Sequence, residues 1–294
     1  MQDIKIIVFR HAVFYSPLIA AIAGGFLRKE GQVGSYQVLP AGASIIDEVA
    51  SGRVDVAQAA VSLSWNDLEN GRKPSVAQFA QINTRDGFFI AGREPDSRFT
   101  WDKLKSAKFM YVHGGQPEIM LRYGAQKMGL DLDDVIDMNK SSTKEMMASW
   151  RSGEGDYFHE QGAYPQQLEH EGCAHLLASV GDAVGPVAFS SLICRWEWLE
   201  TEQARRFTNA YRASRKWVNT AEPGEIARVE SDYFHEHSAE AVGRAIEAYQ
   251  KMGTWQGNIQ IPEDLYENAL NVFEHAKRIT RRHPYEDVVV PPPE

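Results

Sequence analysis

Apolar runs of strand length alternate with amphipathic runs over the first two thirds of the chain. Residues 4–9 are almost continuously apolar, which is typical of a strand buried on both faces of a parallel sheet. Behind Pro17, apolar side chains recur at helical spacing from Leu18 to Phe26, and Gly31 follows as a stop signal. The pattern predicts a strand, a loop and one helix over 17–31.

The same alternation continues to about residue 194 and then changes to long helical patterns. We expect further strands at 36–39, 54–60, 76–82, 87–92, 108–112, 135–138, 156–159, 174–180 and 186–194. Further helices are expected at 45–50, 62–71, 117–128, 142–151, 164–171, 196–219, 224–235, 239–252 and 262–281. The tail from residue 284 is a poor helix former and is expected to lie along the surface or to be loose.

One segment of the chain is repeated. The sequence SGRVD at 51–55 returns as SGEGD at 152–156, so that Asp55 and Asp156 stand 101 residues apart. In both places a short helical pattern ends at a glycine, and the aspartate opens a strand-like run. His11 and His113 stand before the earlier helix of each copy. The repeat indicates one βαβαβ plan used twice, and its period is too long for a solenoid, so it predicts two similar lobes.

Composition and charge exclude some classes of function. The chain has 294 residues, a hydrophobic share of 43% and a net charge of −9, with a pI near 5.5. An acidic protein lacks the basic face that nucleic acids require, so no nucleic-acid partner is expected. No run approaches a membrane span, so no membrane insertion is expected. Of the cysteines, Cys173 and Cys194, we favour two free thiols over a disulfide.

Localisation stays open from the sequence. Residues 4–9 are too short for the core of a signal peptide, and no small-residue cleavage site follows. We expect a periplasmic location if a leader was removed, and a cytoplasmic one if Met1 is the native start.

Two runs carry a family resemblance. HAVFYSPLIAAIAGGFLRKEG at 11–31 and AGASIIDEVASGRVDVAQA at 41–59 resemble the opening of periplasmic-type (type II) substrate-binding proteins, in the branch that handles nitrate, sulfonates, taurine and thiamine-type pyrimidines. The likeness covers residues 4–195 well and the C-terminal helices more loosely. The cysteine-rich run of the pyrimidine synthases of that branch is absent. No lysine or histidine stands where such a synthase would hold its cofactor; Gln58, Ala59 and Ser62 occupy those positions.

The resemblance implies an α/β fold with two doubly wound lobes and a ligand cleft between them. Lobe one would comprise residues 1–88 and 190–294, with the helical C-terminal region packed on it, and lobe two residues 89–189. Two strands would cross between the lobes, near 87–92 and 186–193, where two apolar runs already stand in the sequence.

Candidate site residues follow from the fold class alone. Ligands of open α/β sheets bind beyond the carboxyl ends of the strands, where helix N-termini present free N–H groups. The loops at these ends are rich in aromatic, imidazole, amide and hydroxyl groups, which suits a heteroaromatic or zwitterionic ligand. The ligand-binding candidates are His11, Phe14, Tyr15, Gly42, Ser44, Gln58, Ser62, Trp65, His113, Gly114, Gly115, Gln116, His159 and Glu160.

Each candidate also has a structural interpretation. His11 and His113 could bond backbone groups at strand ends, Trp65 could belong to the core, and Ser44 could serve as a helix N-cap. His11, His113 and His159 with Glu160 would suit zinc only if the loops converge, and we expect no metal. His235, His237 and His283 are expected at the surface.

Two classes of function remain. The first is a solute-binding protein of an ABC-type uptake system, which closes two lobes on a small heteroaromatic, pyrimidine-like or sulfonate-like molecule and meets a transporter permease as its partner. The second is a cytoplasmic enzyme on the same fold that uses His159 and Glu160 as an acid–base pair. The first is favoured, with no catalytic residue and no cofactor.

Overall fold

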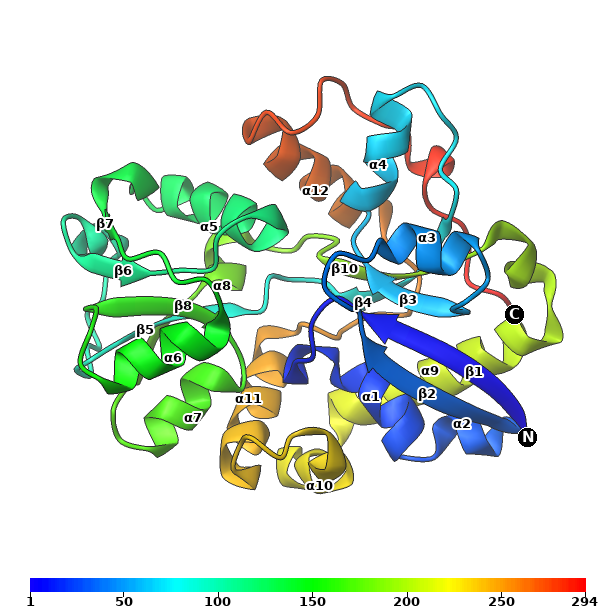
Figure 1. Ribbon diagram of the computed structural model, residues 1–294, viewed down its shortest axis with the longest axis horizontal. Helices are drawn as coiled ribbons and strands as arrows, with labels where there is room; N and C mark the ends of the chain where they lie inside the picture. The colour runs from blue at the N-terminus through cyan, green and yellow to red at the C-terminus, as the bar shows by residue number, and fades with distance from the viewer.

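The computed structural model describes residues 1–294 and contains two separate five-stranded sheets. The sheets stand side by side as the centres of two lobes, with the first sheet on the right and the second on the left of Figure 1. The strand order is β2-β1-β3-β10-β4 in the first sheet and β7-β6-β8-β5-β9 in the second. The molecule is therefore the two-lobed α/β protein that the sequence predicts.

Strand bounds lie close to the apolar runs. The first sheet holds β1 (Gln2–Val8), β2 (Gln32–Val38), β3 (Val56–Ala59), β4 (Ala77–Asn83) and β10 (Ser190–Cys194). The second holds β5 (Phe88–Gly92), β6 (Lys108–Met110), β7 (Ile136–Asp137), β8 (Tyr157–Gln161) and β9 (His175–Ser179). Three neighbouring strands are parallel in each sheet, and the fourth in the order, β10 or β5, runs antiparallel to both of its neighbours.

The repeated aspartates accept equivalent hydrogen bonds in the two lobes. Asp55 Oδ2 accepts a hydrogen bond from the backbone N–H of Lys5 at 2.8 Å, and Asp156 Oδ2 accepts one from that of Lys108, also at 2.8 Å. Each carboxylate thus pairs an N–H of the neighbouring parallel strand, one residue before the two strands begin to pair. The repeated sequence therefore makes the same hydrogen bond between neighbouring strands in both sheets.

The helices of the lobes follow the strands in the expected order. They are α1 (Ser16–Ala23), α2 (Phe26–Lys29), α3 (Ile45–Ala50), α4 (Ser62–Glu69), α5 (Gly115–Lys127), α6 (Thr143–Arg151), α7 (Tyr164–His170) and α8 (Val180–Val184). Short 3₁₀ segments lie at Val13–Tyr15, Trp101–Leu104, Leu132–Asp134, Trp196–Glu200, Ser231–Tyr233 and Tyr285–Asp287.

The single helix predicted over 17–31 is wrong. Gly24 ends α1, and Gly25 adopts the left-handed conformation (φ 73°) before α2 begins. Glycine takes this conformation without the steric cost that a side chain would impose, so the pair breaks the helix where the apolar spacing alone continues it.

The C-terminal helices α9 (Glu202–Thr220), α10 (Pro223–Val229), α11 (Ala239–Met252) and α12 (Glu263–His275) contact both lobes. Helix α9 packs on α1 and α2 of the first lobe, whereas α11 packs on α7 and α12 on α5, both of the second (Figure 1). The tail is not loose: Val288 and Val289 are buried, and Val290 N donates to Gln78 O of β4 at 3.0 Å.

The lobes are joined by two short connections, residues 84–87 and 185–189. They bond to each other, since Val187 N donates to Thr84 O at 2.9 Å and Phe189 N to Asn83 O at 3.1 Å. The apolar runs predicted as crossing strands become β5 and β10, which lie inside the sheets, while the crossings are these connections.

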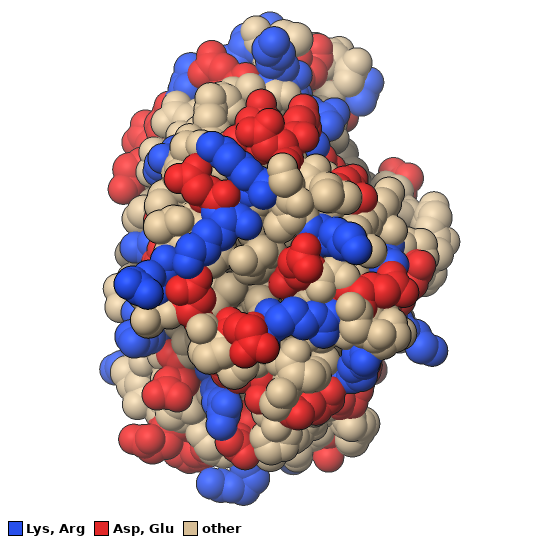
Figure 2. Space-filling model, turned by 90° about the vertical axis from the view of Figure 1, so that its left-hand side faces the viewer, with Lys and Arg blue, Asp and Glu red and all other residues tan.

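On the outer face of the second lobe, acidic and basic side chains are interspersed (Figure 2). The second lobe contains several ion pairs, among them Arg122 with Glu118 and Lys140 with Glu154. None of the helices combines the length and apolar content that crossing a bilayer would require.

Candidate functional site

A cavity of about 720 Å³ lies between the lobes, at the carboxyl ends of β1, β3, β6 and β8. This volume falls in the range of small-molecule sites, about 300–1,000 Å³. We call this cavity the cleft. Its wall comprises Phe9, Arg10, Tyr15, Gln58, Ala59, Ala60, Ser62, Leu63, Trp65, Asn66, Phe88, Val112, Gly115, Gln116, Pro117, Ile119, Gln161, Phe189, Ser190, Phe273, Arg278 and Ile279.

Six of the residues predicted from the sequence line the cleft: Tyr15, Gln58, Ser62, Trp65, Gly115 and Gln116. Gln58 accepts a hydrogen bond from Phe9 N at 3.1 Å, which fixes its amide. Gln116, from the second lobe, donates to Phe189 O at 2.7 Å in the connection between the lobes.

Trp65 belongs to the cleft and to the core at once. Its side chain is only 1% exposed, its indole Nε1 donates to Tyr266 Oη at 2.8 Å, and it packs edge-on against Phe273. Trp65 is therefore a core residue that also borders the cavity, and its truncation would disturb packing as well as the wall.

Three buried polar side chains from different parts of the chain line the cleft. Tyr15, Gln161 and Ser190 are buried, and burial raises the pKa of Tyr15 above its usual value. Gln161 Oε1 has no hydrogen-bond partner. Because an unpaired buried acceptor is costly, this oxygen is a suitable partner for an N–H or O–H group of a solute.

Two helices begin at the cleft without side-chain caps. Neither α4 nor α5 has a capping hydrogen bond at its N-cap residue, Val61 or Gly114. By contrast, Ser44 Oγ accepts from Asp47 N at the start of α3, and Ser142 Oγ accepts from Glu145 N at the start of α6. At the start of α5 the Glu118 carboxylate accepts a hydrogen bond from Gly114 N at 2.7 Å, whereas the first turn of α4 has no acidic residue. The positive end of α4 therefore favours electronegative atoms at the cleft.

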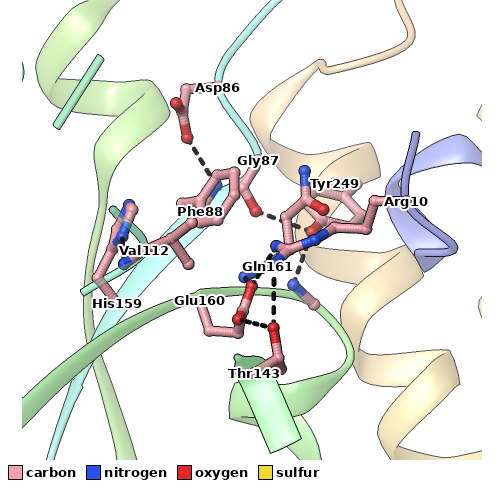
Figure 3. Close-up of polar contacts among 11 residues, drawn as sticks. Arg10, Asp86, Gly87, Phe88, Val112, Thr143, His159, Glu160, Gln161 and Tyr249 are labelled. Carbon is pink, nitrogen blue, oxygen red and sulfur yellow. Dashed lines mark hydrogen bonds and ion pairs between the residues drawn. The ribbon is translucent and has the colours of Figure 1, made fainter. Parts of the chain in front are cut away.

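The charged residues of the cleft are both arginines, Arg10 and Arg278, and no carboxylate, lysine or histidine lines it. Arg10 crosses between the lobes: its Nη1 lies 2.6 Å from Glu160 Oε1, and its Nη2 donates to Thr143 Oγ1 at 3.0 Å (Figure 3). Thr143 in turn donates to Glu160 Oε2 at 2.7 Å. We call this arrangement of Arg10, Thr143 and Glu160 the interlobe clasp.

The paired residues of the enzyme hypothesis, His159 and Glu160, face opposite sides of β8, because successive strand residues alternate. The His159 ring is fully buried, stacks on Phe88 and accepts from Val112 N at 3.4 Å (Figure 3). Burial, followed by the charge of Arg10, lowers its pKa to about 3. A neutral imidazole on one face and a carboxylate on the other cannot serve one substrate atom.

The other predicted residues lie outside the cleft wall. His11 bonds Tyr233 O and the Tyr36 hydroxyl and stacks on Phe234, and burial lowers its pKa. His113 stacks on Tyr111 and lies 2.9 Å from Asp137.

Phe14 is fully buried beside the lobe connection, where it leaves no room for a side chain at Gly87. Gly42, Ser44 and Gly114 lie on loops beyond the wall. No three His, Cys, Asp or Glu side chains are grouped as metal ligands, and both cysteines are free thiols.

Sequence reasoning missed the side chains that come from outside the strand-end loops. Phe189 and Ser190 come from the return connection and β10, and Phe273, Arg278 and Ile279 from the end of α12. His283 was expected at the surface but is only 2% exposed and stacks on Trp65. The cation-rich run at 277–282 is the one signal in the sequence, and it does not reveal which arginine lines the cleft.

Comparison with known proteins gives the fold a context. No protein-family profile matches the chain. It is 25% identical over 293 residues to a Bacillus subtilis (strain 168) protein named "Putative binding protein YtlA", covering 98% of this chain and 88% of that one.

Solved structures are similar over the whole chain. The ligand-binding component of an ABC-type import system from Staphylococcus aureus, crystallised with zinc bound, aligns with a TM-score of 0.75 at 16% identity, over 99% of this chain and 97% of that one. The periplasmic aliphatic sulphonate-binding protein SsuA from Escherichia coli aligns with a TM-score of 0.73 at 12% identity, over 99% and 93%. The fold of this chain is that of the periplasmic solute-binding proteins.

Proposed function

We propose that this chain, which has the fold of periplasmic solute-binding proteins, is the ligand-binding component of an ABC-type import system. It would hold one small organic molecule in the cleft and present it to the permease of that system. The observation that carries the proposal is a cavity of about 720 Å³, placed between two lobes and lined by side chains from both.

The composition of the wall supports a flat organic molecule as the solute. Aromatic rings come from the segment after β1 (Phe9, Tyr15), from β5 of the second sheet (Phe88) and from the return connection (Phe189). Such rings bind apolar or aromatic surface, while a few buried amides and hydroxyls orient it. A pyrimidine-like heteroaromatic compound or an organic sulfonate fits this description, and the Escherichia coli relative is named for a sulphonate.

The proposed mechanism is closure of the lobes. We propose the boundaries 1–88 with 190–294 for the first lobe and 89–189 for the second, with the short connections at 84–87 and 185–189 as the hinge. A hinge needs few residues, since small backbone rotations in short connections move whole lobes. No chemical step is required, and no observation favours the enzyme alternative.

Binding is tested by thermal-shift screening against organic sulfonates, pyrimidines, aromatic acids and nitrate, with calorimetry on each hit. We expect at least one aromatic compound or sulfonate to bind with one molecule per chain and to be recovered unchanged. Ala60→Trp, which fills the cleft, should abolish binding, whereas Ala41→Trp at an exposed position outside it should not.

Two results would count against the proposal. Binding that survives Ala60→Trp would place the site elsewhere, and conversion of the hit during incubation would indicate an enzyme. Small-angle scattering adds a check on the mechanism, because closure on the solute should lower the radius of gyration.

A further inference from the structure

The two arginines of the cleft differ in how their charges are compensated. Arg10 lies 2.6 Å from Glu160 in the interlobe clasp, so its charge is largely neutralised within the protein. The guanidinium of Arg278 forms no ion pair and no hydrogen bond within the protein, and only its backbone N–H donates, to Phe273 O. Arg278 is therefore the uncompensated cation of a cleft that no carboxylate lines.

Local backbone geometry explains why Arg278 faces the cleft. Helix α12 ends in a Schellman turn, in which Lys277 N donates to Glu274 O and Arg278 N to Phe273 O, both at 2.9 Å. Lys277 takes the left-handed conformation (φ 54°) that this turn requires. The turn brings Arg278 back beside Phe273, and both line the cleft.

The residues after this turn are anchored to α4. Glu69, the last residue of α4, accepts hydrogen bonds from Thr280 Oγ1 at 2.6 Å, from Thr280 N at 3.1 Å and from His283 Nε2 at 2.7 Å. Arg281 adds a bond to Leu68 O at 2.7 Å. We call residues 276–283 the C-terminal strap; it is fixed at both ends and holds Arg278 at the cleft.

One of the neighbouring helix starts adds to the same electrostatic preference. The N-termini of α4 and α5 bring Ser62 and Gly115 to the cleft wall. At α5 the Glu118 carboxylate accepts a hydrogen bond from Gly114 N at 2.7 Å, whereas the first turn of α4 contains no acidic residue. The positive end of α4 and the unpaired guanidinium of Arg278, an exposed residue of the cleft wall, both favour an anion over a neutral or cationic group.

We propose that Arg278 is the specificity-determining residue that selects an anionic group on the solute, and that the solute is an organic acid with an aromatic or other apolar body. This inference rests on the proposed function, since it assigns a role within the same cleft. The acidic end lies toward Arg278, and a hydrogen-bond donor of the solute faces Gln161.

The test compares pairs of probes that share an aromatic body with an amino donor and differ in charge: 4-aminobenzenesulfonate with 4-aminobenzenesulfonamide, and 6-aminonicotinate with 6-aminonicotinamide. Calorimetry should show that the wild-type protein binds the anion of a pair at least about tenfold more tightly than the amide, the size expected of one charge-assisted hydrogen bond. Arg278→Gln should remove this preference by weakening the anion alone. Lys277→Gln, the same change of charge one residue away and outside the cleft wall, should keep it.

Other outcomes would overturn the inference in distinguishable ways. Equal binding of acid and amide by the wild-type protein would refute the anion selection and leave the proposed function standing. Loss of both probes in Arg278→Gln would assign Arg278 a structural role instead. Failure of every aromatic probe and every other screened solute to bind wild-type protein would refute the proposed function as well.

Discussion

Asp86 lies in the first connection between the lobes, and its carboxyl group accepts a single hydrogen bond. The side chain is fully buried; Oδ1 accepts from Phe88 N at 2.7 Å, and Oδ2 has no partner (Figure 3). Burial raises its pKa to about 8 from an ordinary value of 3.8, against the opposing effect of the Phe88 bond. The native protein therefore keeps a neutral carboxylic acid at its connection at neutral pH.

This protonation makes stability depend on pH in a definite direction. Between the ordinary pKa and about 8 the unfolded chain releases the Asp86 proton and the native protein retains it, so stability falls as pH rises. Relative to Asp86→Asn, the wild-type free energy of unfolding should drop by up to about 1.4 kcal/mol per pH unit. Urea unfolding at several pH values from 5 to 8 measures the difference, and Asp102→Asn, at an exposed site, is the control. If the free energies of unfolding of the wild type and of Asp86→Asn change in parallel with pH, the prediction is contradicted.

The sequence predicts cleft residues whose position follows from the end of a strand. It does not predict those whose position depends on tertiary contacts. Gln58 lies near the carboxyl end of β3 and Gly115 opens α5, and both line the cleft, as the position of these elements in the sequence leads one to expect. His11 and His159 stand at equally suitable positions, yet their rings stack on Phe234 and Phe88 instead. Which face a strand-end side chain takes depends on partners far away in the chain, and a single sequence does not contain that information.

At the level of elements, the helices divide by how they begin. Helices α3 and α6 start at serine caps, whereas α4 and α5, which begin at the cleft, have none. The capping pattern of Ser142 and Glu145 was readable from the sequence because it is local. The break at Gly24 and Gly25 was readable in principle, but apolar spacing on both sides hid it. Local chemistry thus fixes element ends better than periodicity does.

Two serines at helix starts should respond to mutation in opposite ways. Ser44→Ala removes the cap of α3, which should lower the free energy of unfolding by about 1 kcal/mol and leave solute affinity unchanged, since Ser44 is not in the cleft wall. Ser62→Ala, at the start of α4 and in the wall, should weaken binding with little effect on stability. Chemical denaturation and calorimetry on both variants check this, and weaker solute binding by Ser44→Ala would show that Ser44 acts as a ligand.

For the whole molecule, the interlobe clasp should influence how far the lobes open without a solute. Glu160→Gln keeps the size of the side chain and removes its charge, weakening the pair with Arg10. A charge-assisted hydrogen bond is worth about 1.5–3 kcal/mol, so the ratio of open to closed molecules should rise by about tenfold or more. Single-molecule energy transfer between dyes on the two lobes would measure it.

The matched control is Glu154→Gln, because Glu154 pairs with Lys140 at 2.6 Å within the second lobe alone. That substitution should leave the distribution of distances between the lobes unchanged. If Glu160→Gln also leaves it unchanged, the clasp does not contribute to closure.

The order of the strands also has a consequence for how the protein forms during synthesis. Every strand of the second sheet lies between residues 88 and 179, so that sheet is complete once a contiguous middle stretch has left the ribosome. The first sheet must wait for β10, which begins at Ser190, and its edge for Val289, near the end of the chain. The second sheet can therefore complete its native pairing before the first, whose N-terminal strands have to wait for β10 and Val289 to be synthesised.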